Sequence, residues 1–140
     1  MTDLAKYTSL RVGGPAKKVL QVSTEAQIIA AIEEAGDSPV LIIGGGTNML
    51  ISDKGFDGTV IRISNNSVQA EVDACSGATL TIGAGEDWDN FVQTTIDRGF
   101  AGLETLSGIP GTVGAAPIQN IGAYGHEVSE FITRVRTYDR

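Results

Sequence analysis

Two glycine-rich segments are the parts of this 140-residue chain whose residue types could hold an anion. The first is Gly44-Gly45-Gly46-Thr47-Asn48, which directly follows the apolar run Val40–Ile43. Successive glycines let the backbone turn its N–H groups toward a phosphate, and Thr47 and Asn48 add side-chain hydrogen bonds. It lacks the lysine of a Walker A loop, and Met49 stands where the Rossmann fingerprint has its last glycine. These residues alone leave two interpretations open: a phosphate-binding loop, or a strained turn that binds nothing.

The second segment runs from Leu106 to Pro117 and has glycines at positions 108, 111 and 114 around Pro110. Small residues after a proline can open a short helical turn with exposed N–H groups, which is a second place for an anion. The chain continues into Gln119–Gly125, which has no periodicity and is typical of a functional loop on a scaffold. Long glycine loops that bind nothing are uncommon, so the two segments together favour a dinucleotide.

Other chemically active side chains support only structural roles. We interpret His126, next to Glu127, as a surface residue, and Trp88 and Phe91 as core residues rather than a stack for a flavin. Cys75 is the only cysteine and His126 the only histidine, so neither a disulfide nor a zinc site is expected. We predict no catalytic constellation and no metal.

The elements that must position the first segment form a βαβ lobe. Three apolar runs are predicted strands: Lys18–Val22, Val40–Ile43 and Thr59–Ile63. Thr24 and Gln27 have the spacing of a capping box that opens a helix, and Gly36 ends that helix. The second run is uninterrupted, which predicts a strand covered on both faces, and the third follows a turn-rich stretch at 53–58. Gly44 then lies at the carboxyl edge of a parallel sheet, where such sheets bind ligands.

A second lobe is expected from residue 66 onward. Val68–Ala74 and Thr79–Ile82 alternate apolar and polar residues, which predicts an antiparallel pair joined at Ser76-Gly77 with one wet face. A helix capped by Asp87 or Glu86 follows; its predicted apolar face and its closing residues are Trp88, Phe91, Val92, Thr95, Ile96, Arg98 and Gly99. Ile132–Tyr138 alternates as a strand and ends without a cap, so we expect a truncated chain. The exposed edge of that strand could pair with a second copy, which predicts self-association.

Composition narrows the partners. Ten Lys plus Arg against seventeen Asp plus Glu leave a net charge of −7, which opposes binding of nucleic acid. No run reaches the ~18 apolar residues that span a bilayer, and the first residues lack the pattern of a signal peptide. We therefore expect a cytoplasmic protein without a membrane partner.

Five motifs, in this order along the chain, carry a family resemblance: Thr8–Gly14, Gly44–Asn48, Gly83–Gly85, Gly108–Gly114 and Gln119–Gly125. Together they resemble the N-terminal part of the UDP-N-acetylenolpyruvoylglucosamine reductase family, also called UDP-N-acetylmuramate dehydrogenase. The last motif is long and unusual, which makes the resemblance specific. One departure is Tyr7, where the family more often has Asn.

The resemblance implies an α+β, two-lobed FAD-binding fold of the vanillyl-alcohol-oxidase (PCMH) type. Residues 1–65 would be the βαβ lobe and residues 66–140 an incomplete antiparallel-sheet lobe, C-terminally truncated, with the substrate domain absent. NADPH would reduce the FAD, which would reduce the enolpyruvyl group of a UDP-sugar in peptidoglycan synthesis, and so serve cell-wall biogenesis, cell shape and cell division. The catalytic Ser, Glu and Arg of the family lie beyond the matching segment, so the fragment is expected to be inactive alone.

Residue by residue, the resemblance also implies contacts. Tyr124 would lie on the substrate side of the flavin. The residues implied to hold a non-covalent FAD are Gly44, Gly45, Gly46, Thr47, Asn48, Ile109, Pro110, Gly111, Thr112, Gly114, Ala115, Ile118 and Gly122. Two alternatives remain open at this point: another FAD-dependent oxidase or dehydrogenase of the same fold, or a folded fragment that binds no cofactor and is not an enzyme.

Overall fold

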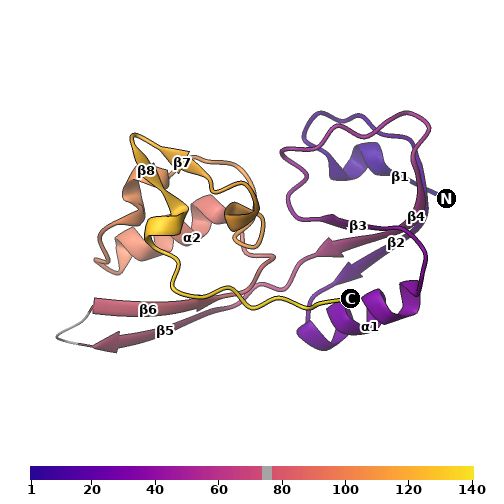
Figure 1. Ribbon diagram of the computed structural model, residues 1–140. Coiled ribbons are helices and arrows are strands. Elements are labelled where there is room, and N and C mark those ends of the chain that lie inside the picture. Colours follow the sequence, from indigo (N-terminus) through magenta and orange to yellow (C-terminus); the bar gives the residue numbers. More distant parts are fainter. Residues whose placement is uncertain (74–76) are drawn as a thin grey trace. The chain divides into compact units, whose positions relative to one another are not determined.

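The computed structural model describes residues 1–73 and 77–140, and the chain forms two compact units (Figure 1). The first unit comprises residues 1–65 with 137–140, and the second comprises residues 66–136. The sequence assigns residues 137–140 to the second lobe, whereas the structure groups them with the first unit. The reason is local contact: the Tyr138 hydroxyl donates to the Glu33 carboxylate over 3.3 Å, and the Arg140 guanidinium donates to the Gly36 carbonyl oxygen.

The first unit is built on a four-stranded sheet, whose strands are β1 (Thr2–Asp3), β2 (Pro15–Val22), β3 (Val40–Ile43) and β4 (Phe56–Ile63). Its strand order is β1-β2-β4-β3, with β2, β4 and β3 parallel and β1 antiparallel to β2. The three predicted strands are present, but β4 lies between the other two. β4 also begins at Phe56, so the turn predicted for 53–58 is wrong from that residue onward.

Helix α1 (Glu25–Ala35) covers one face of the sheet, and the short 3-10 helix η1 (Leu4–Tyr7) lies on the other (Figure 1). The Thr24 side chain accepts a hydrogen bond from the Gln27 N–H over 3.2 Å, as predicted for the N-cap. The Gln27 side chain, however, accepts from the Ser23 N–H at 2.9 Å, one residue before the position that a capping box requires. Gly36 ends the helix with a φ of +50°.

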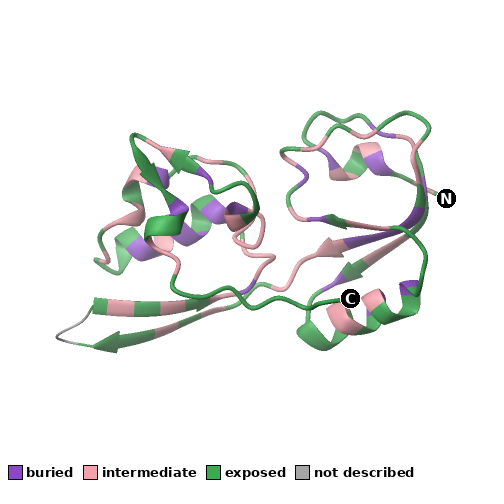
Figure 2. Cartoon of the chain, viewed as in Figure 1, coloured by how far each residue is buried: buried purple, intermediate pink, exposed green. Residues whose placement is uncertain are grey.

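The two faces of this sheet have separate cores. Leu4, Ala16, Ile43 and Val60 are buried on the η1 side, and Val22, Ala31 and Ile61 are buried on the α1 side. Strand β3 is only partly covered on the α1 side, where Val40 packs on the core, and not fully covered on both faces as predicted, because it is an edge strand and α1 packs over β2 and β4. Ile42 is accordingly 46% exposed. Figure 2 colours the exposed part of the sheet and its loops green.

The second unit contains a hairpin, β5 (Val68–Asp73) and β6 (Gly77–Ile82), and a helix, α2 (Trp88–Asp97). The antiparallel pairing is confirmed, with Val68 opposite Ile82 and Asp73 opposite Gly77. The predictions that fall on Ala74, Cys75 and Ser76 lie outside the described residues. The Asp87 side chain caps α2 by accepting from the Asn90 N–H over 3.0 Å.

The core of this unit forms around α2 and confirms the structural interpretation of its aromatic residues. Trp88 and Phe91 are 3% and 6% exposed and pack edge to face, with ring centroids 5.9 Å apart. Val92 and Thr95 are buried with them, whereas Ile96 is 40% exposed and does not belong to the buried face. Gly99 follows the helix with a φ of +75°.

The remainder of the second unit consists of short elements: η2 (Leu103–Leu106), η3 (Ala116–Ile118), β7 (Gly122–Ala123), β8 (His126–Glu127) and η4 (Val128–Glu130). The strand predicted for Ile132–Tyr138 is wrong. Ile132 packs on the core, residues 133–140 are exposed, and no strand of the described chain pairs with them. An alternating pattern forms a strand only where a neighbouring strand receives its hydrogen bonds. Self-association was predicted from the exposed edge of that strand. It remains a prediction, but the strand on which it rested is absent. No helix in the described part of the chain is long and apolar enough to cross a bilayer.

Candidate functional site

The first glycine loop, Gly44–Asn48, begins where β3 ends, at the carboxyl edge of the parallel strands. Gly44 and Thr47 are half-buried, Gly45 and Asn48 are exposed, and Gly46 is buried. Within the described residues, the N–H groups of Gly44, Gly45 and Gly46 donate no hydrogen bond. Backbone N–H groups without a protein acceptor, in a partly exposed loop, can donate hydrogen bonds to a bound anion. Backbone donors in folded proteins normally have an acceptor, so three neighbouring ones without a protein acceptor in the described chain indicate a place for a ligand.

The conformation of this loop depends on Gly46. Its φ is +65°, and a Cβ added there would lie 1.8 Å from the carbonyl oxygen of Tyr7. The Gly46 carbonyl in turn accepts from the Ser9 N–H over 3.0 Å. Only a residue without a side chain can approach another backbone this closely, so the glycine is required by geometry.

The Thr8–Gly14 motif is the partner that fixes the first glycine loop. The Thr8 hydroxyl donates to the Val12 carbonyl over 2.8 Å and accepts from the Val12 N–H over 3.2 Å, which closes a turn. Arg11, inside that turn, has a φ of +56°. At the end of the motif, the Gly14 N–H donates to the Ser52 carbonyl over 2.9 Å. With the Ser9 N–H bond to the Gly46 carbonyl, these contacts pack the Thr8–Gly14 motif against the first glycine loop and the residues that follow it.

The second glycine loop, Gly108–Ala115, pairs with the Gly83–Gly85 motif. The Gly114 N–H donates to the Ala84 carbonyl and the Val113 N–H donates to the Glu86 carbonyl, each over 2.9 Å. A Cβ on Gly114 would lie 2.5 Å from the Ala84 Cβ, so these two strands of backbone touch. The N–H groups of Ile109, Gly111 and Thr112 donate no hydrogen bond within the described residues.

The last motif forms a hairpin that the sequence interpretation missed. Gly122 pairs with Glu127 across β7 and β8, and Tyr124 and Gly125 form the two-residue turn with φ values of +55° and +84°. Two successive positive φ angles are the signature of a type I′ turn. A glycine at the second turn position was the signal, but tyrosine is an unusual residue at the first.

The side chains predicted to face the ligand in this region are exposed. Tyr124 is 89% exposed at the tip of the hairpin, and Ile118 is 84% exposed at the end of η3. Ile109 is half-buried and packs against the core of the second unit. The second unit therefore brings residues 109–115 onto the 83–85 motif, while Ile118, Gly122 and Tyr124 present open surface.

His126 is an exposed residue, as interpreted from the sequence. Its Nδ1 lies 3.0 Å from a Glu130 carboxylate oxygen. This imidazole contact, and then the Glu127 N–H, hold the pKa of Glu130 below its usual value. The carboxylates of Glu127 and Glu130 are both exposed, whereas a general acid typically lies in a buried position.

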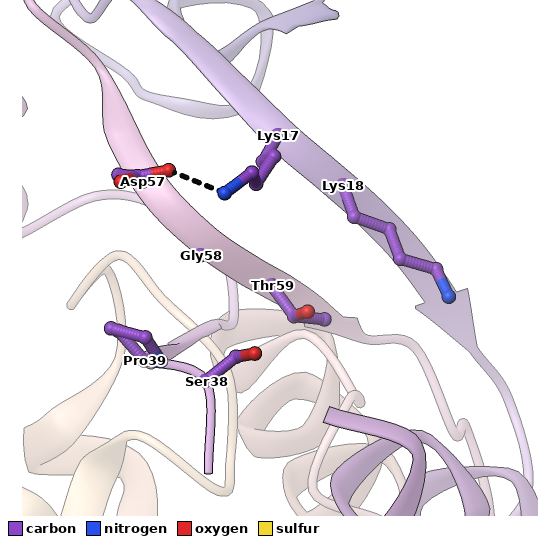
Figure 3. A pocket seen from close by; sticks show the side chains of 7 residues that line it. All are labelled: Lys17, Lys18, Ser38, Pro39, Asp57, Gly58 and Thr59. Carbon is purple, nitrogen blue, oxygen red and sulfur yellow. Dashed lines mark ion pairs between the residues drawn. The ribbon is translucent and has the colours of Figure 1, made fainter. Parts of the chain in front are cut away.

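One surface hollow lies at the amino end of the same parallel strands, opposite the first glycine loop (Figure 3). It is lined by Lys17, Lys18, Ser38, Pro39, Asp57, Gly58 and Thr59. Lys17 forms an ion pair with Asp57 at 3.0 Å, and Lys18 forms one with Glu34 at 2.5 Å. Both lysines are already paired with carboxylates, so the hollow offers no free positive charge to an anion.

One family match assigns the chain to a family of known proteins. The family described as FAD binding domain matches residues 16–140. The chain belongs to the FAD-binding domain family. The FAD-binding domain assignment and the observed elements confirm the α+β fold class expected from the sequence.

Among full-length relatives, this FAD-binding domain is 50% identical to the UDP-N-acetylenolpyruvoylglucosamine reductase of Cutibacterium acnes, over 98% of this chain and 37% of that protein. It is also 50% identical to the same reductase of Streptomyces coelicolor, over 98% of this chain and 35% of that protein. The chain thus spans little more than a third of these relatives. The family resemblance inferred from the motifs is confirmed.

A solved structure agrees. The crystal structure of UDP-N-acetylenolpyruvylglucosamine reductase from Thermus caldophilus matches with a TM-score of 0.71 and 30% identity. The match covers 91% of this chain and 44% of that chain. The similarity to this reductase therefore extends from sequence to fold, over most of this chain.

Proposed function

We propose that this chain is the FAD-binding part of a UDP-N-acetylenolpyruvoylglucosamine reductase and binds FAD without a covalent bond. The observation that carries the proposal is the set of undonated N–H groups at Gly44, Gly45 and Gly46, in a chain that is 50% identical to such reductases. No histidine stands at positions 47 or 48 to form a bond to the flavin.

The residues of the first glycine loop fit the diphosphate of FAD. Its charge needs several donors, and a chain with a net charge of −7 supplies few free cations. Backbone N–H groups meet this need because they are partial positive charges that add nothing to the net charge. Gly44, Gly45 and Gly46 would donate to the phosphate oxygens, and Thr47 and Asn48 would add their polar side chains.

The second glycine loop would line the flavin. Its undonated N–H groups at Ile109, Gly111 and Thr112 match the polar edge of an isoalloxazine ring, and the half-buried Ile109 side chain matches its apolar body. Further contacts are proposed at Pro110, Gly114, Ala115, Ile118 and Gly122. The exposed Tyr124 side chain would lie on the side from which the UDP-sugar approaches.

The proposed reaction of the whole protein is the NADPH-dependent reduction of the enolpyruvyl group of the UDP-sugar, in the cytoplasmic stage of peptidoglycan synthesis. Bound FAD would supply hydride transfer from NADPH to the substrate. The described residues contribute binding and orientation of the cofactor. Protonation of the substrate is assigned to residues of the family that lie beyond the matching segment, so this chain by itself is proposed to be inactive.

The test is a titration of the purified chain with FAD, followed by absorbance and by quenching of flavin fluorescence. We expect saturable binding of one FAD per chain, and no oxidation of NADPH when the enolpyruvyl UDP-sugar is added. Gly45→Ala adds a methyl group at the exposed loop and should weaken FAD binding. Gly77→Ala is the control: it lies at the first residue of β6, outside both glycine loops, where φ is +90° and nothing lies within 4 Å of a Cβ, so any strain it causes should leave FAD binding unchanged. A chain that folds but shows no saturable binding overturns the proposal and supports a fragment without cofactor.

A further inference from the structure

Trp88, in the first turn of α2, hydrogen-bonds the residues just before and just after the segment Ser107–Pro110. The Trp88 indole N–H donates to the Leu106 carbonyl oxygen over 2.8 Å, and the Trp88 backbone N–H donates to the Gly111 carbonyl oxygen over 3.1 Å. Trp88 is 3% exposed and belongs to the core of the second unit, so both anchor points are attached to a buried residue. The segment between them, Ser107–Pro110, spans the start of the helix.

Asp89 is the residue that fixes this spanning segment. One oxygen of its carboxylate accepts from the Ser107 hydroxyl over 2.9 Å and from the Gly108 N–H over 2.6 Å. These two hydrogen bonds, the Gly108 N–H first, lower the pKa of Asp89, so the carboxylate is charged at neutral pH. Hydrogen bonds to a charged acceptor are shorter and stronger than those between neutral groups.

Packing does not impose the conformation of Gly108. Its φ is +78°, and nothing lies within 4 Å of the position of a Cβ. Two kinds of contact hold this turn: backbone anchors, which are the Ser107 N–H bond to the Glu104 carbonyl oxygen and the two Trp88 bonds, and the Asp89 carboxylate, which binds both turn residues directly. The Asp89 carboxylate also has no duty in capping α2, because the Asp87 side chain already accepts from the Asn90 N–H.

We propose that Asp89 is a positioning residue for the flavin end of the cofactor site, acting through the turn at Ser107-Gly108. The inference rests on the proposed function. By holding this turn, Asp89 aligns the undonated N–H groups of Ile109, Gly111 and Thr112 before the cofactor arrives. A preorganised loop binds more tightly because its ordering entropy is lost during folding rather than during binding. Asp89 itself is not assigned a contact with FAD.

The experiment compares three variants of the chain: Asp89→Ala, Asp89→Asn and Asp97→Ala. Asp97 is the matched control, because it is a carboxylate at the other end of α2 that, among the described residues, accepts from the Gln93 amide alone, over 2.9 Å. Asn keeps an acceptor oxygen without the charge. We expect Asp89→Ala to weaken FAD binding about tenfold, Asp89→Asn about threefold or less, and Asp97→Ala to leave it unchanged.

A second ligand separates positioning from general damage. ADP carries the adenine and diphosphate but no flavin, so Asp89→Ala should leave its affinity, measured by competition, the same. In the chain without cofactor, amide hydrogen exchange should speed up at residues 108–112 in Asp89→Ala and stay unchanged in Asp97→Ala. A merely structural role would instead lower the affinities for FAD and ADP together.

The outcomes are decisive. Equal FAD affinity of Asp89→Ala and Asp97→Ala, with exchange at residues 108–112 unaltered, overturns the positioning role while the FAD proposal stands. If the unmodified chain folds but binds no FAD, the proposed function fails instead. If Asp89→Ala does not fold, Asp89→Asn and Ser107→Ala each remove part of the contact, and both must weaken FAD binding more than Asp97→Ala does.

Discussion

The carbonyl oxygen of Tyr7 occupies the space next to Gly46 that any side chain would need, since a Cβ on Gly46 would lie 1.8 Å from that oxygen. Contact of backbone with backbone at this distance cannot be relieved by a rotamer change. The Tyr7 ring meanwhile lies beneath the Arg62 guanidinium, whose carbon is 5.6 Å from the ring centroid. Arg62 pairs with Ile43, the residue just before the first glycine loop. Tyr7 therefore supports the first glycine loop through both its backbone and its ring.

Gly46→Ala should destabilise the first unit and abolish the FAD binding proposed above. The left-handed φ of +65° costs about 1 kcal/mol for alanine, and displacement of the Tyr7 backbone adds to it, so a loss above about 2 kcal/mol is expected. The control is Gly36→Ala, where φ is +50° but nothing lies within 4 Å of a Cβ. Denaturant titration of both variants is the measurement. Equal losses for the two would show that the Tyr7 contact is relieved at no cost.

Tyr124→Asn should stabilise the second unit. Tyr124 is 89% exposed with a φ of +55° in a type I′ turn, a position that asparagine adopts more readily. We expect a gain of about 0.5 kcal/mol in the free energy of unfolding. Gly125→Ala, at a φ of +84°, should have the opposite sign. Tyr124→Asn should also lower the turnover proposed for the whole protein, because the exposed ring is proposed to lie on the side from which the UDP-sugar approaches. Unchanged turnover would contradict that role.

Trp88→Phe should destabilise the second unit by about 2 kcal/mol. The variant leaves the buried Leu106 carbonyl without the indole donor and opens a small cavity in the core. Ile96→Ala on the same helix should cost less than about 1 kcal/mol, because Ile96 is 40% exposed. Thermal unfolding followed by circular dichroism compares the two. Similar losses would mean that the indole hydrogen bond contributes little.

The second unit should lose stability in acid. The pKa values of three of its carboxyl groups are lowered: Asp89, Glu104 and Glu130. For Glu104 the causes are its own N–H and then that of Gly102. A depressed folded pKa contributes stability that is complete above the unfolded values of 3.8 and 4.5, and that is lost as the pH falls through the lower folded values.

The measurement for this acid loss is the thermal midpoint as a function of pH, followed by the fluorescence of Trp88, the only tryptophan. The midpoint should fall more steeply below about pH 4.5 in the unmodified chain than in the triple variant Asp89→Asn, Glu104→Gln, Glu130→Gln. Parallel curves for the two proteins would show that these carboxylates titrate alike in the folded and unfolded states.

Helices α1 and α2 were predictable from the sequence because their signals are local, whereas the short 3-10 helices were not predicted. Thr24 and Asp87 cap the helices that follow them, and Gly36 and Gly99 follow their ends, within a residue of where the sequence predicts. Strand order was not predictable, because β4 reaches its place between β2 and β3 through pairings between distant residues. The same limit explains the incorrect strand prediction at 132–138. Alternation of apolar and polar residues describes the two faces of a possible strand, but it does not show that a neighbouring strand is there to pair with it.

The glycine loops illustrate the boundary between pattern and geometry. The sequence identified both as candidate anion sites, yet the contact of Tyr7 with Gly46 joins residues 39 positions apart and leaves no periodic signal. Asp89 was missed for a related reason. An acidic residue in the first turn of a helix is ordinarily read as favourable to the helix itself, and only the three-dimensional path of Ser107-Gly108 shows that it holds another segment.

The order of strands in the first unit also sets the order of events during synthesis. β2 and β3 each pair with β4 and not with one another, so a nascent chain that has left the ribosome only as far as residue 50 can form α1 but none of the parallel ladder. The first glycine loop has by then emerged without the sheet edge that supports it. Its shape is acquired after residue 63 arrives, which makes β4 the element whose delay would leave the nascent unit exposed to aggregation.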